Sequence, residues 1–302
     1  TNISIDKVLI SQVLDQFYEL KITLQAFGET ENEVPLSVFS NNKAIAKTIA
    51  KFETQKTEIA ITIPKNDFHG NISIEDNSLS YDNDYCLSIS KPEKANVIAI
   101  GNSDKNNFLS RIFTADEFNF KSTELATLDY NQIENQDAIV LNELEDLPVA
   151  LGTTLKSFYE KGGNIVLIPN AKNSPSLLNA FAKNFGGLNY SELSTSGKQI
   201  TKINFNHPLY QTVFEKKVTN FQYPNVKESF TLSGITNILQ YEDNSVFVGS
   251  TTNRLGTFYA FSAPINKQNS NFQNAPLIVP TFYNMGQNQG KTGITAYTIG
   301  EN

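Results

Sequence analysis

Apolar and polar residues alternate with a period of two along roughly the first ninety residues, in short runs separated by polar turns. Such alternation is typical of strands with one buried face. Asn41-Asn42 and His69-Gly70-Asn71 are among the turn signals, and asparagine tolerates the positive φ of a tight hairpin. Seven or so strands at near-regular spacing predict an antiparallel β-sandwich of the immunoglobulin type over residues 1–91. The alternating apolar positions include Ile3, Ile5, Val8, Ile10, Tyr18, Leu20, Ile22, Leu24, Leu36, Val38, Ile59, Ile61, Ile63, Ile72, Ile74, Tyr85, Leu87 and Ile89.

The pattern changes after a polar, proline-containing linker at residues 91–94. Continuous apolar runs now replace the alternation, as in strands buried on both faces of a parallel sheet, at residues 97–101, 137–141 and 164–169. Helical periodicity lies between or after them, at residues 107–115, 149–161 and 176–185. Alternating strands and helices predict an α/β domain over residues 95–302, with a mainly parallel central sheet and right-handed crossovers.

The last third of the chain again favours strands. Residues 200–264 are strand-rich, and residues 245–249 and 256–261 predict a hairpin across Thr252-Asn253. Residues 276–285 are compatible with a final helix. The tail at residues 293–299 reads as one strand, and we expect its partner to lie outside this chain.

Composition indicates a folded protein with a weakly charged surface. The 302 residues include 21 Phe and 12 Tyr, whereas only 18% are charged. With 24 basic and 31 acidic residues the net charge is −7, which argues against nucleic acid as a partner. We interpret Lys216-Lys217 and the scattered Lys43, Lys47 and Lys51 as solvated surface.

Cys86 is the only cysteine, so no intrachain disulfide forms. It lies in an alternating run, where a buried structural thiol is expected. No run reaches the roughly 18 apolar residues that span a bilayer, and no signal peptide is recognised. The chain begins at Thr1, and we expect it to be a piece of a longer protein.

The segment at residues 137–169, DAIVLNELEDLPVALGTTLKSFYEKGGNIVLIP, resembles the core of class I glutamine amidotransferase-like domains. The whole chain resembles the periplasmic region of BatA-type aerotolerance-regulator membrane proteins. Supporting stretches are residues 79–85, residues 206–209 with Phe214, and residues 258–264.

This resemblance implies an immunoglobulin-like sandwich followed by a degenerate, flavodoxin-like amidotransferase domain. It also implies a non-catalytic interaction or scaffold region of a membrane-anchored envelope protein, located in the periplasm and related to aerotolerance or stress. Other envelope proteins are the expected partners, and the membrane is reached only through segments outside this chain. The family's membrane helices and metal-ion-dependent adhesion motif do not occur in the sequence, so their functions are not carried over.

The sequence lacks the pattern of catalytic residues that an amidotransferase-type enzyme needs. Such an enzyme needs a nucleophile at a strand-to-helix elbow and a histidine that activates it. The predicted strand at residues 137–141 is followed by Asn142-Glu143-Leu144-Glu145, without thiol or hydroxyl, and Gly101-Asn102-Ser103 lacks the second glycine. We therefore expect no catalytic residue and no enzyme, although a triad using Ser103 and His207 stays open.

Metal and phosphate sites are also not expected. Asp82 with Asp84, and Glu143 with Glu145 and Asp146, are oxygen ligands without the EF-hand pattern. We interpret the first pair as a turn, and the second group as acids before the helix that starts at Val149. No G-x-G-x-x-G follows the first buried strand, so no nucleotide cofactor is expected.

A polar cleft remains conceivable where the parallel strands end. Gly101-Asn102, Asn142-Glu143 and Pro169-Asn170 would line it, or the asparagines would simply cap loops. Two alternatives to the scaffold function stay open. One is a hydrolase or transferase with an unorthodox site on the α/β domain, which requires a hydroxyl or thiol close to His207 within a pocket. The other is a carbohydrate-binding module, which requires a flat row of exposed rings; core packing is the favoured use of the aromatics.

Overall fold

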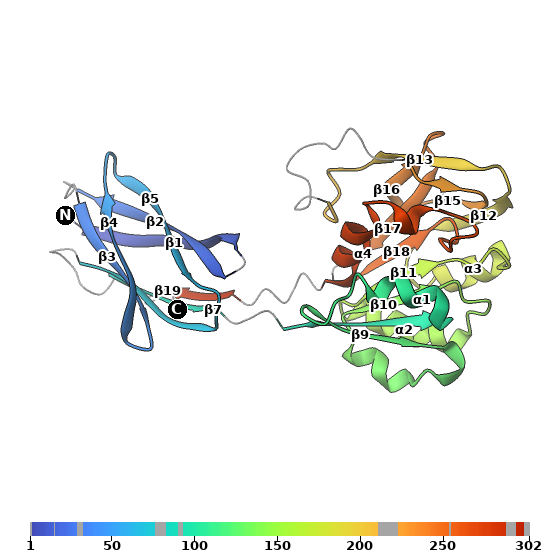
Figure 1. Cartoon of the computed structure of the whole chain (residues 1–302), viewed down its shortest axis with the longest axis horizontal. Coiled ribbons are helices and arrows are strands. Elements are labelled where there is room, and N and C mark those ends of the chain that lie inside the picture. The colour runs from blue at the N-terminus through green and yellow to red at the C-terminus, as the bar shows by residue number, and fades with distance from the viewer. Residues whose placement is uncertain are drawn as a thin grey trace. The chain divides into compact units, whose positions relative to one another are not determined.

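A computed structural model describes residues 2–14, 16–28, 33–75, 83–89, 93–210, 223–253, 255–287 and 294–298. The chain forms two compact units, here called unit 1 (residues 1–93 with 291–302) and unit 2 (residues 94–290). Both are rich in β-structure (Figure 1), with antiparallel sheets in unit 1 and a large mixed sheet in unit 2.

Unit 1 consists of two antiparallel sheets, ordered β1-β2-β5 and β19-β7-β6-β3-β4. Inward-facing residues such as Leu20, Leu36 and Ile72 are fully buried between them, as the period of two predicts. The strands are β1 (Asn2–Val13), β2 (Phe17–Phe27), β3 (Glu33–Ser40), β4 (Lys43–Lys51), β5 (Lys56–Pro64), β6 (Phe68–Ile74), β7 (Asp84–Ile89) and β19 (Ile294–Thr298).

Two predicted turns in unit 1 had different outcomes. Asn41 and Asn42 join β3 to β4 with φ of 48° and 63°, which confirms the tight hairpin. The turn predicted at His69-Gly70-Asn71 is wrong, because these residues lie within β6. Gly70 is needed there for close pairing: a Cβ would lie 1.7 Å from the Phe39 carbonyl oxygen. Cys86 on β7 is only half-buried, unlike the buried thiol expected.

The C-terminal strand corrects the predicted domain boundary. β19 pairs antiparallel with β7, from Ile294 opposite Ile89 to Thr298 opposite Tyr85. The tail strand therefore has its partner inside this chain, and the second domain does not run to residue 302. Unit 2 is inserted in the sequence between two neighbouring strands of unit 1, a long-range pairing that local patterns do not reveal.

Unit 2 contains a nine-stranded sheet ordered β14-β13-β16-β17-β18-β11-β10-β8-β9 and a separate β12-β15 pair. Its strands are β8 (Ala95–Gly101), β9 (Phe118–Thr123), β10 (Ala138–Asn142), β11 (Asn164–Ile168), β12 (Asn189–Ser194), β13 (Lys198–Ile203), β14 (Asn225–Val226), β15 (Ser229–Ser233), β16 (Thr236–Tyr241), β17 (Val246–Thr252) and β18 (Thr257–Phe261). Its helices are α1 (Ser103–Ser110), α2 (Val149–Glu160), α3 (Pro175–Ala182) and α4 (Ile278–Gly286), with short 3₁₀ turns η2 (Leu125–Thr127), η3 (Tyr130–Asn135) and η4 (Phe272–Asn274).

The large sheet is mixed, not mainly parallel as predicted. β9, β8, β10, β11 and β18 are parallel neighbours, whereas β18, β17, β16, β13 and β14 pair antiparallel. The β17–β18 hairpin predicted across Thr252-Asn253 is confirmed, and it is the point where the sheet changes direction. Numbered among themselves in chain order, the five parallel strands stand in the order 2-1-3-4-5.

Helices cover both faces of the parallel half. Alternate strand residues separate the two cores: Val97, Val140 and Val166 pack with α1 and α4. Ile98 and Ile139 on the opposite face pack with α2 and α3. This sandwiching explains the continuous apolar runs in the sequence.

Side chains cap the starts of two helices, α1 and α3. α1 starts at Ser103 because Asn102 Oδ1 accepts hydrogen bonds from the Asp104 and Lys105 amides at 3.0 and 3.3 Å. The helix predicted at residues 107–115 begins four residues earlier and ends at Ser110, so the two ranges share only residues 107–110. Ser174 caps α3 by accepting from the Leu177 amide at 3.2 Å, as its Ser-Pro signal predicts.

Candidate functional site

The candidate site lies at the carboxyl edge of the parallel strands, where open α/β sheets bind ligands. Asn142 pairs with Gly101 of β8 and with Ile168 of β11, so the three predicted loop segments meet at this edge. Gly101 is required here: its φ is 154°, and a Cβ would lie 2.5 Å from the Asn142 carbonyl oxygen. The sequence therefore predicted correctly that these segments meet at one edge of the sheet, whereas a cleft between them stays a prediction.

Glu143 is the central residue of this edge. It directly follows β10 and adopts a φ of 53°, which is unusual for a residue other than glycine. Its amide donates to the Ile168 carbonyl at 2.9 Å, and its side chain is only 2% exposed. The backbone thus turns sharply after the strand and directs a carboxylate into a closed environment.

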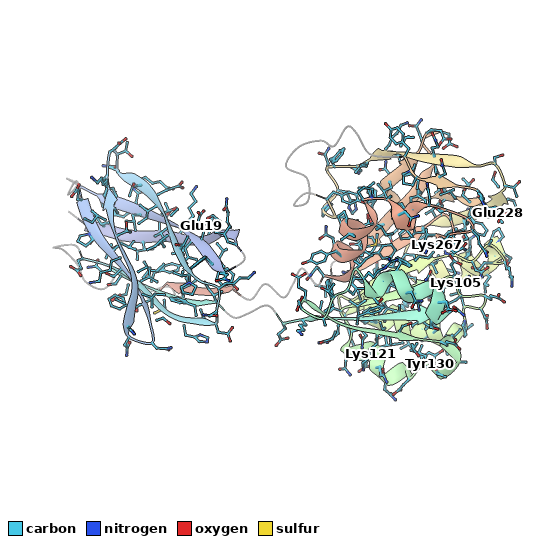
Figure 2. The ribbon with its side chains drawn as sticks, in the orientation of Figure 1. Glu19, Lys105, Lys121, Tyr130, Glu228 and Lys267 are labelled. Carbon is cyan, nitrogen blue, oxygen red and sulfur yellow. The ribbon has the colours of Figure 1, made fainter. Side chains whose placement is uncertain are left out.

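Both carboxylate oxygens of Glu143 accept hydrogen bonds from within the protein. Lys105 Nζ of α1 lies 2.6 Å from Oε2. Asn266, in the loop after β18, donates its backbone amide to Oε1 at 2.9 Å and its Nδ2 to Oε1 and Oε2 at 3.0 and 2.9 Å. Figure 2 labels Lys105 of α1 and Lys267, the residue that follows Asn266 in the loop after β18. One ion pair and three hydrogen bonds compensate the buried charge.

The asparagines of this edge hold loops together. Asn170 Nδ2 donates to the Glu143 carbonyl at 2.9 Å. Asn173 Nδ2 donates to the carbonyls of Leu144 and Glu145, both at 3.1 Å. The sequence allowed these asparagines either to line a polar cleft or to cap loops. The observed hydrogen bonds are those of loop caps.

Asn142 and Asn106 form a second buried contact beside Glu143. Asn142 Nδ2 donates to Asn106 Oδ1 at 2.8 Å and to the Lys105 carbonyl at 3.1 Å. Among the described residues, nothing donates to Asn142 Oδ1, which is buried. An orphaned acceptor costs about 1–3 kcal/mol, so this edge is not optimised for stability throughout.

His207 does lie close to a hydroxyl, but the polarity of the contact is wrong for catalysis. His207 Nδ1 accepts a hydrogen bond from the Leu209 amide at 3.2 Å, so the ring proton resides on Nε2. Nε2 therefore donates to Ser250 Oγ at 2.9 Å and does not take its proton. His207 lines a cavity of about 240 Å³ to which Ser250 does not contribute. Burial lowers the pKa of His207, so the ring is neutral at pH 7.

The open possibility of a triad with Ser103 is wrong. Ser103 follows the carboxyl end of β8, whereas the cavity at His207 is lined by Asn164 and Thr257, the first residues of β11 and β18. The two groups lie at opposite ends of parallel strands, more than ~10 Å apart. His69, the other histidine, contacts Ser88 Oγ through Nδ1 at 2.7 Å in unit 1.

The acidic residues weighed as metal ligands do not converge. Glu143 pairs with Lys105, and Glu145 pairs with Lys172 at 2.6 Å. They precede α2, as predicted, but none of them lies in its first turn. Asp84 accepts from Asn71 at 2.7 Å, and Asp82 lies outside the described residues. Within the described ranges, no three His, Cys, Asp or Glu side chains gather as a metal site would require.

Among the residues that the structure describes, exposed aromatic rings do not form the row that a flat carbohydrate-binding surface requires. Among the described residues the exposed rings are Phe17, Phe27 and Tyr223. Phe17 and Phe27 lie at opposite ends of β2, about 30 Å apart at the usual strand rise, and Tyr223 belongs to the other unit. Most other rings, such as Phe247 and Phe261, are buried in the cores.

Sequence reasoning found Glu143 and the strand-end asparagines but missed their partners. Lys105 lies in the first turn of α1, and Asn266 follows β18, 123 positions after Glu143. Only the order of strands in the sheet brings these groups together. The positive φ of Glu143 also has no sequence signal, because such positions usually carry glycine or asparagine.

No protein-family model matches the chain, and no curated protein matches it. Among solved structures, the β-galactosidase of Rahnella sp. R3 is similar at 12% identity and a TM-score of 0.45, over 66% of this chain and 32% of that enzyme. A ThuA-like protein of Bacteroides uniformis ATCC 8492 is similar at 14% identity and a TM-score of 0.47, over 67% and 95% of the two chains. The exo-β-1,4-mannosidase Op5Man5 of Opitutaceae bacterium strain TAV5 is similar at 10% identity and a TM-score of 0.39, over 56% and 31%.

The chain matches about a third of the length of these two glycosidases. Likenesses this distant carry no statement about what the present chain does. Among the residues that the structure describes, no helix combines the length and apolar character needed to cross a bilayer.

Proposed function

We propose that this chain is a non-catalytic interaction or scaffold region of a membrane-anchored envelope protein, located in the periplasm. Its partners are other envelope proteins, and its role relates to aerotolerance or stress, as the resemblance to BatA-type regulators implies. For unit 1 we infer an immunoglobulin-like fold. For unit 2 we infer a degenerate amidotransferase-like domain with flavodoxin-like topology, supported by the 2-1-3-4-5 order of its parallel strands.

The state of Glu143 is the observation that carries the proposal. On this proposal, Glu143, which has a positive φ directly after a buried strand, corresponds to the nucleophile elbow of related enzymes. A catalytic group there needs a path to substrate and a free lone pair or proton. The Glu143 carboxylate has neither, since it is 2% exposed and both oxygens accept from Lys105 or Asn266. The Glu143 side chain therefore holds the loop after β18 in place through its hydrogen bonds with Asn266.

The alternative, an unorthodox hydrolase or transferase, would need His207 as its general base. His207 donates to Ser250, so it does not activate that hydroxyl. The serine also does not line the neighbouring cavity.

Site-specific photo-cross-linking in an envelope fraction tests the proposal. The full chain carries a benzophenone amino acid at Ile49 of β4 or at Val149 of α2, both exposed apolar positions, with exposed Thr231 as the control position. We expect one discrete envelope protein to be captured from Ile49 or Val149 and not from Thr231. Capture from none of the positions, together with hydrolysis of a reporter ester or amide by the same preparation, would contradict it.

A further inference from the structure

Unit 2 has a cavity of about 240 Å³ at the amino edge of its parallel strands, opposite Glu143. Asn164 and Thr257 are the first residues of β11 and β18 and line it from the sheet. Pro208 and Leu255 line it from the loop before residue 210 and from the β17–β18 hairpin. Its position is independent of the elbow on which the proposed function rests.

The described lining of this cavity carries no formal charge at neutral pH. Its titratable members are His207 and Tyr259. Burial lowers the pKa of His207, and burial raises the pKa of Tyr259 to about 12 against the opposing effect of the Thr257 hydroxyl. An ionic ligand would lose its hydration without a counter-charge, so carboxylates, phosphates and amines are disfavoured.

Two side-chain amide oxygens in the cavity lining can each accept a hydrogen bond from a ligand. Asn164 Nδ2 donates to the carbonyls of Met285 and Gln287 at 3.2 and 3.1 Å, which leaves Oδ1 without a donor among the described residues. Asn284 Nδ2 donates to the Leu209 carbonyl at 2.7 Å, which leaves its Oδ1 in the same state. A complementary ligand therefore brings several hydrogen-bond donors, as hydroxyl groups do.

The cavity also has an apolar wall and a limited size. Leu255 is 70% exposed beside Pro208, so an apolar ligand face would bury surface that the protein leaves open. The volume holds roughly eight waters at about 30 Å³ each, and is below the range of roughly 300–1,000 Å³ for drug-sized ligands. A ligand with a single ring fits this space.

We propose that this cavity binds an uncharged, polyhydroxylated ring compound: a monosaccharide unit, either free or at the end of a glycan. Its hydroxyls donate to the Asn164 and Asn284 side-chain oxygens, and its C–H face packs on Leu255 and Pro208. Exclusion of charge distinguishes the site from one for sugar phosphates or uronic acids.

Ligand-observed saturation-transfer NMR with the full chain tests this proposal. The probes are the methyl glycosides of glucose, galactose, mannose and N-acetylglucosamine, their β-linked disaccharides, and glucuronic acid and glucose 6-phosphate as charged counterparts. Thr252→Phe fills the cavity mouth from an exposed position, and Leu255→Glu replaces the apolar wall by a charge. Thr236→Phe on neighbouring β16 is the matched control, because Thr236 is exposed and lies outside the cavity.

We expect at least one neutral probe to bind with a Kd on the order of 1 mM, about tenfold more weakly to Thr252→Phe and Leu255→Glu, and unchanged to Thr236→Phe. Binding of free glycosides assigns the site to monosaccharides, and binding of the disaccharides alone assigns it to glycan ends. Absence of binding by every neutral probe would overturn the proposal. So would equal binding of the charged probes, or binding that Thr252→Phe and Leu255→Glu leave intact.

Discussion

At the scale of single residues, the polar side chains of greatest interest, Glu143 and His207, form hydrogen bonds within the protein. Glu143 binds Lys105 and Asn266, and His207 binds Ser250 and the Leu209 amide. Residue types alone made both positions candidates for chemistry. In the structure, the carboxylate oxygens of Glu143 and both ring nitrogens of His207 have hydrogen-bond partners within the protein.

The first residue-scale prediction concerns the protonation of His207. Its folded-state pKa lies below the unfolded value of about 6.5, so the unfolded chain binds more protons between these values. The stabilisation is therefore present above pH 6.5 and is lost as the pH falls towards the folded pKa. An NMR titration of the histidine ring protons, assigned with His207→Gln, should give a midpoint below 6.5.

Denaturant unfolding as a function of pH checks the same statement. The fall in stability between pH 7 and pH 5 should be smaller in His207→Gln than in the wild type, while His69→Gln serves as the control for the other histidine. A His207 midpoint at or above 6.5 would show that the ring is not held in its neutral form.

The second residue-scale prediction concerns Gly256 in the β17–β18 hairpin. A Cβ at this position would lie 2.2 Å from the Tyr159 carbonyl oxygen and 2.8 Å from that of Gly163. Because backbone atoms cannot yield as a flexible side chain does, Gly256→Ala should lower the free energy of unfolding by about 1–3 kcal/mol. Gly187→Ala is the matched control, since its Cβ would meet nothing within 4 Å. Equal denaturation midpoints for the two variants would refute this packing.

At the scale of elements, local patterns predicted what local interactions decide. The β3–β4 hairpin, α2, α3, the β17–β18 hairpin and the buried strands of unit 2 followed from turn residues, caps and apolar periodicity. β9 was missed because its sequence, FNFKST, has one buried residue and lies at the sheet edge. The 123-residue separation of Glu143 from Asn266 explains why half of the candidate site was unpredictable.

β19 provides the prediction at this scale. Deleting residues 291–302 removes the ladder partner of β7, which exposes its backbone groups along five paired positions. We expect the free energy of unfolding of unit 1 to fall by about 2.5–7.5 kcal/mol, counting roughly one hydrogen bond of roughly 0.5–1.5 kcal/mol for each of the five paired positions. Hydrogen exchange should become faster in β7 and stay unchanged in β10 and β11. Deletion of residues 299–302 alone is the control, and unchanged exchange in β7 would show that β19 does not pair there.

At the scale of the whole molecule, the sequence of unit 2 is inserted between two strands of unit 1 that pair with each other. The sequence pattern separated the two units correctly near residue 93 but assigned the tail to the wrong one. It did so because strand pairing over 200 positions leaves no local trace. A parallel half and an antiparallel half meet at β18, and the candidate site belongs to the parallel half.

The central claim is that the Glu143 carboxylate stabilises the fold and performs no reaction. The free energy of unfolding of Glu143→Gln tests this claim most directly. Chemical unfolding of unit 2 is compared with that of Glu145→Gln, whose carboxylate also pairs with a lysine at 2.6 Å but is 66% exposed. We predict that Glu143→Gln loses about 1–3 kcal/mol and Glu145→Gln less than about 0.5 kcal/mol. A Glu143→Gln protein as stable as the wild type, or more stable, is the result expected of a catalytic group held at a cost to the fold, and it would contradict this account.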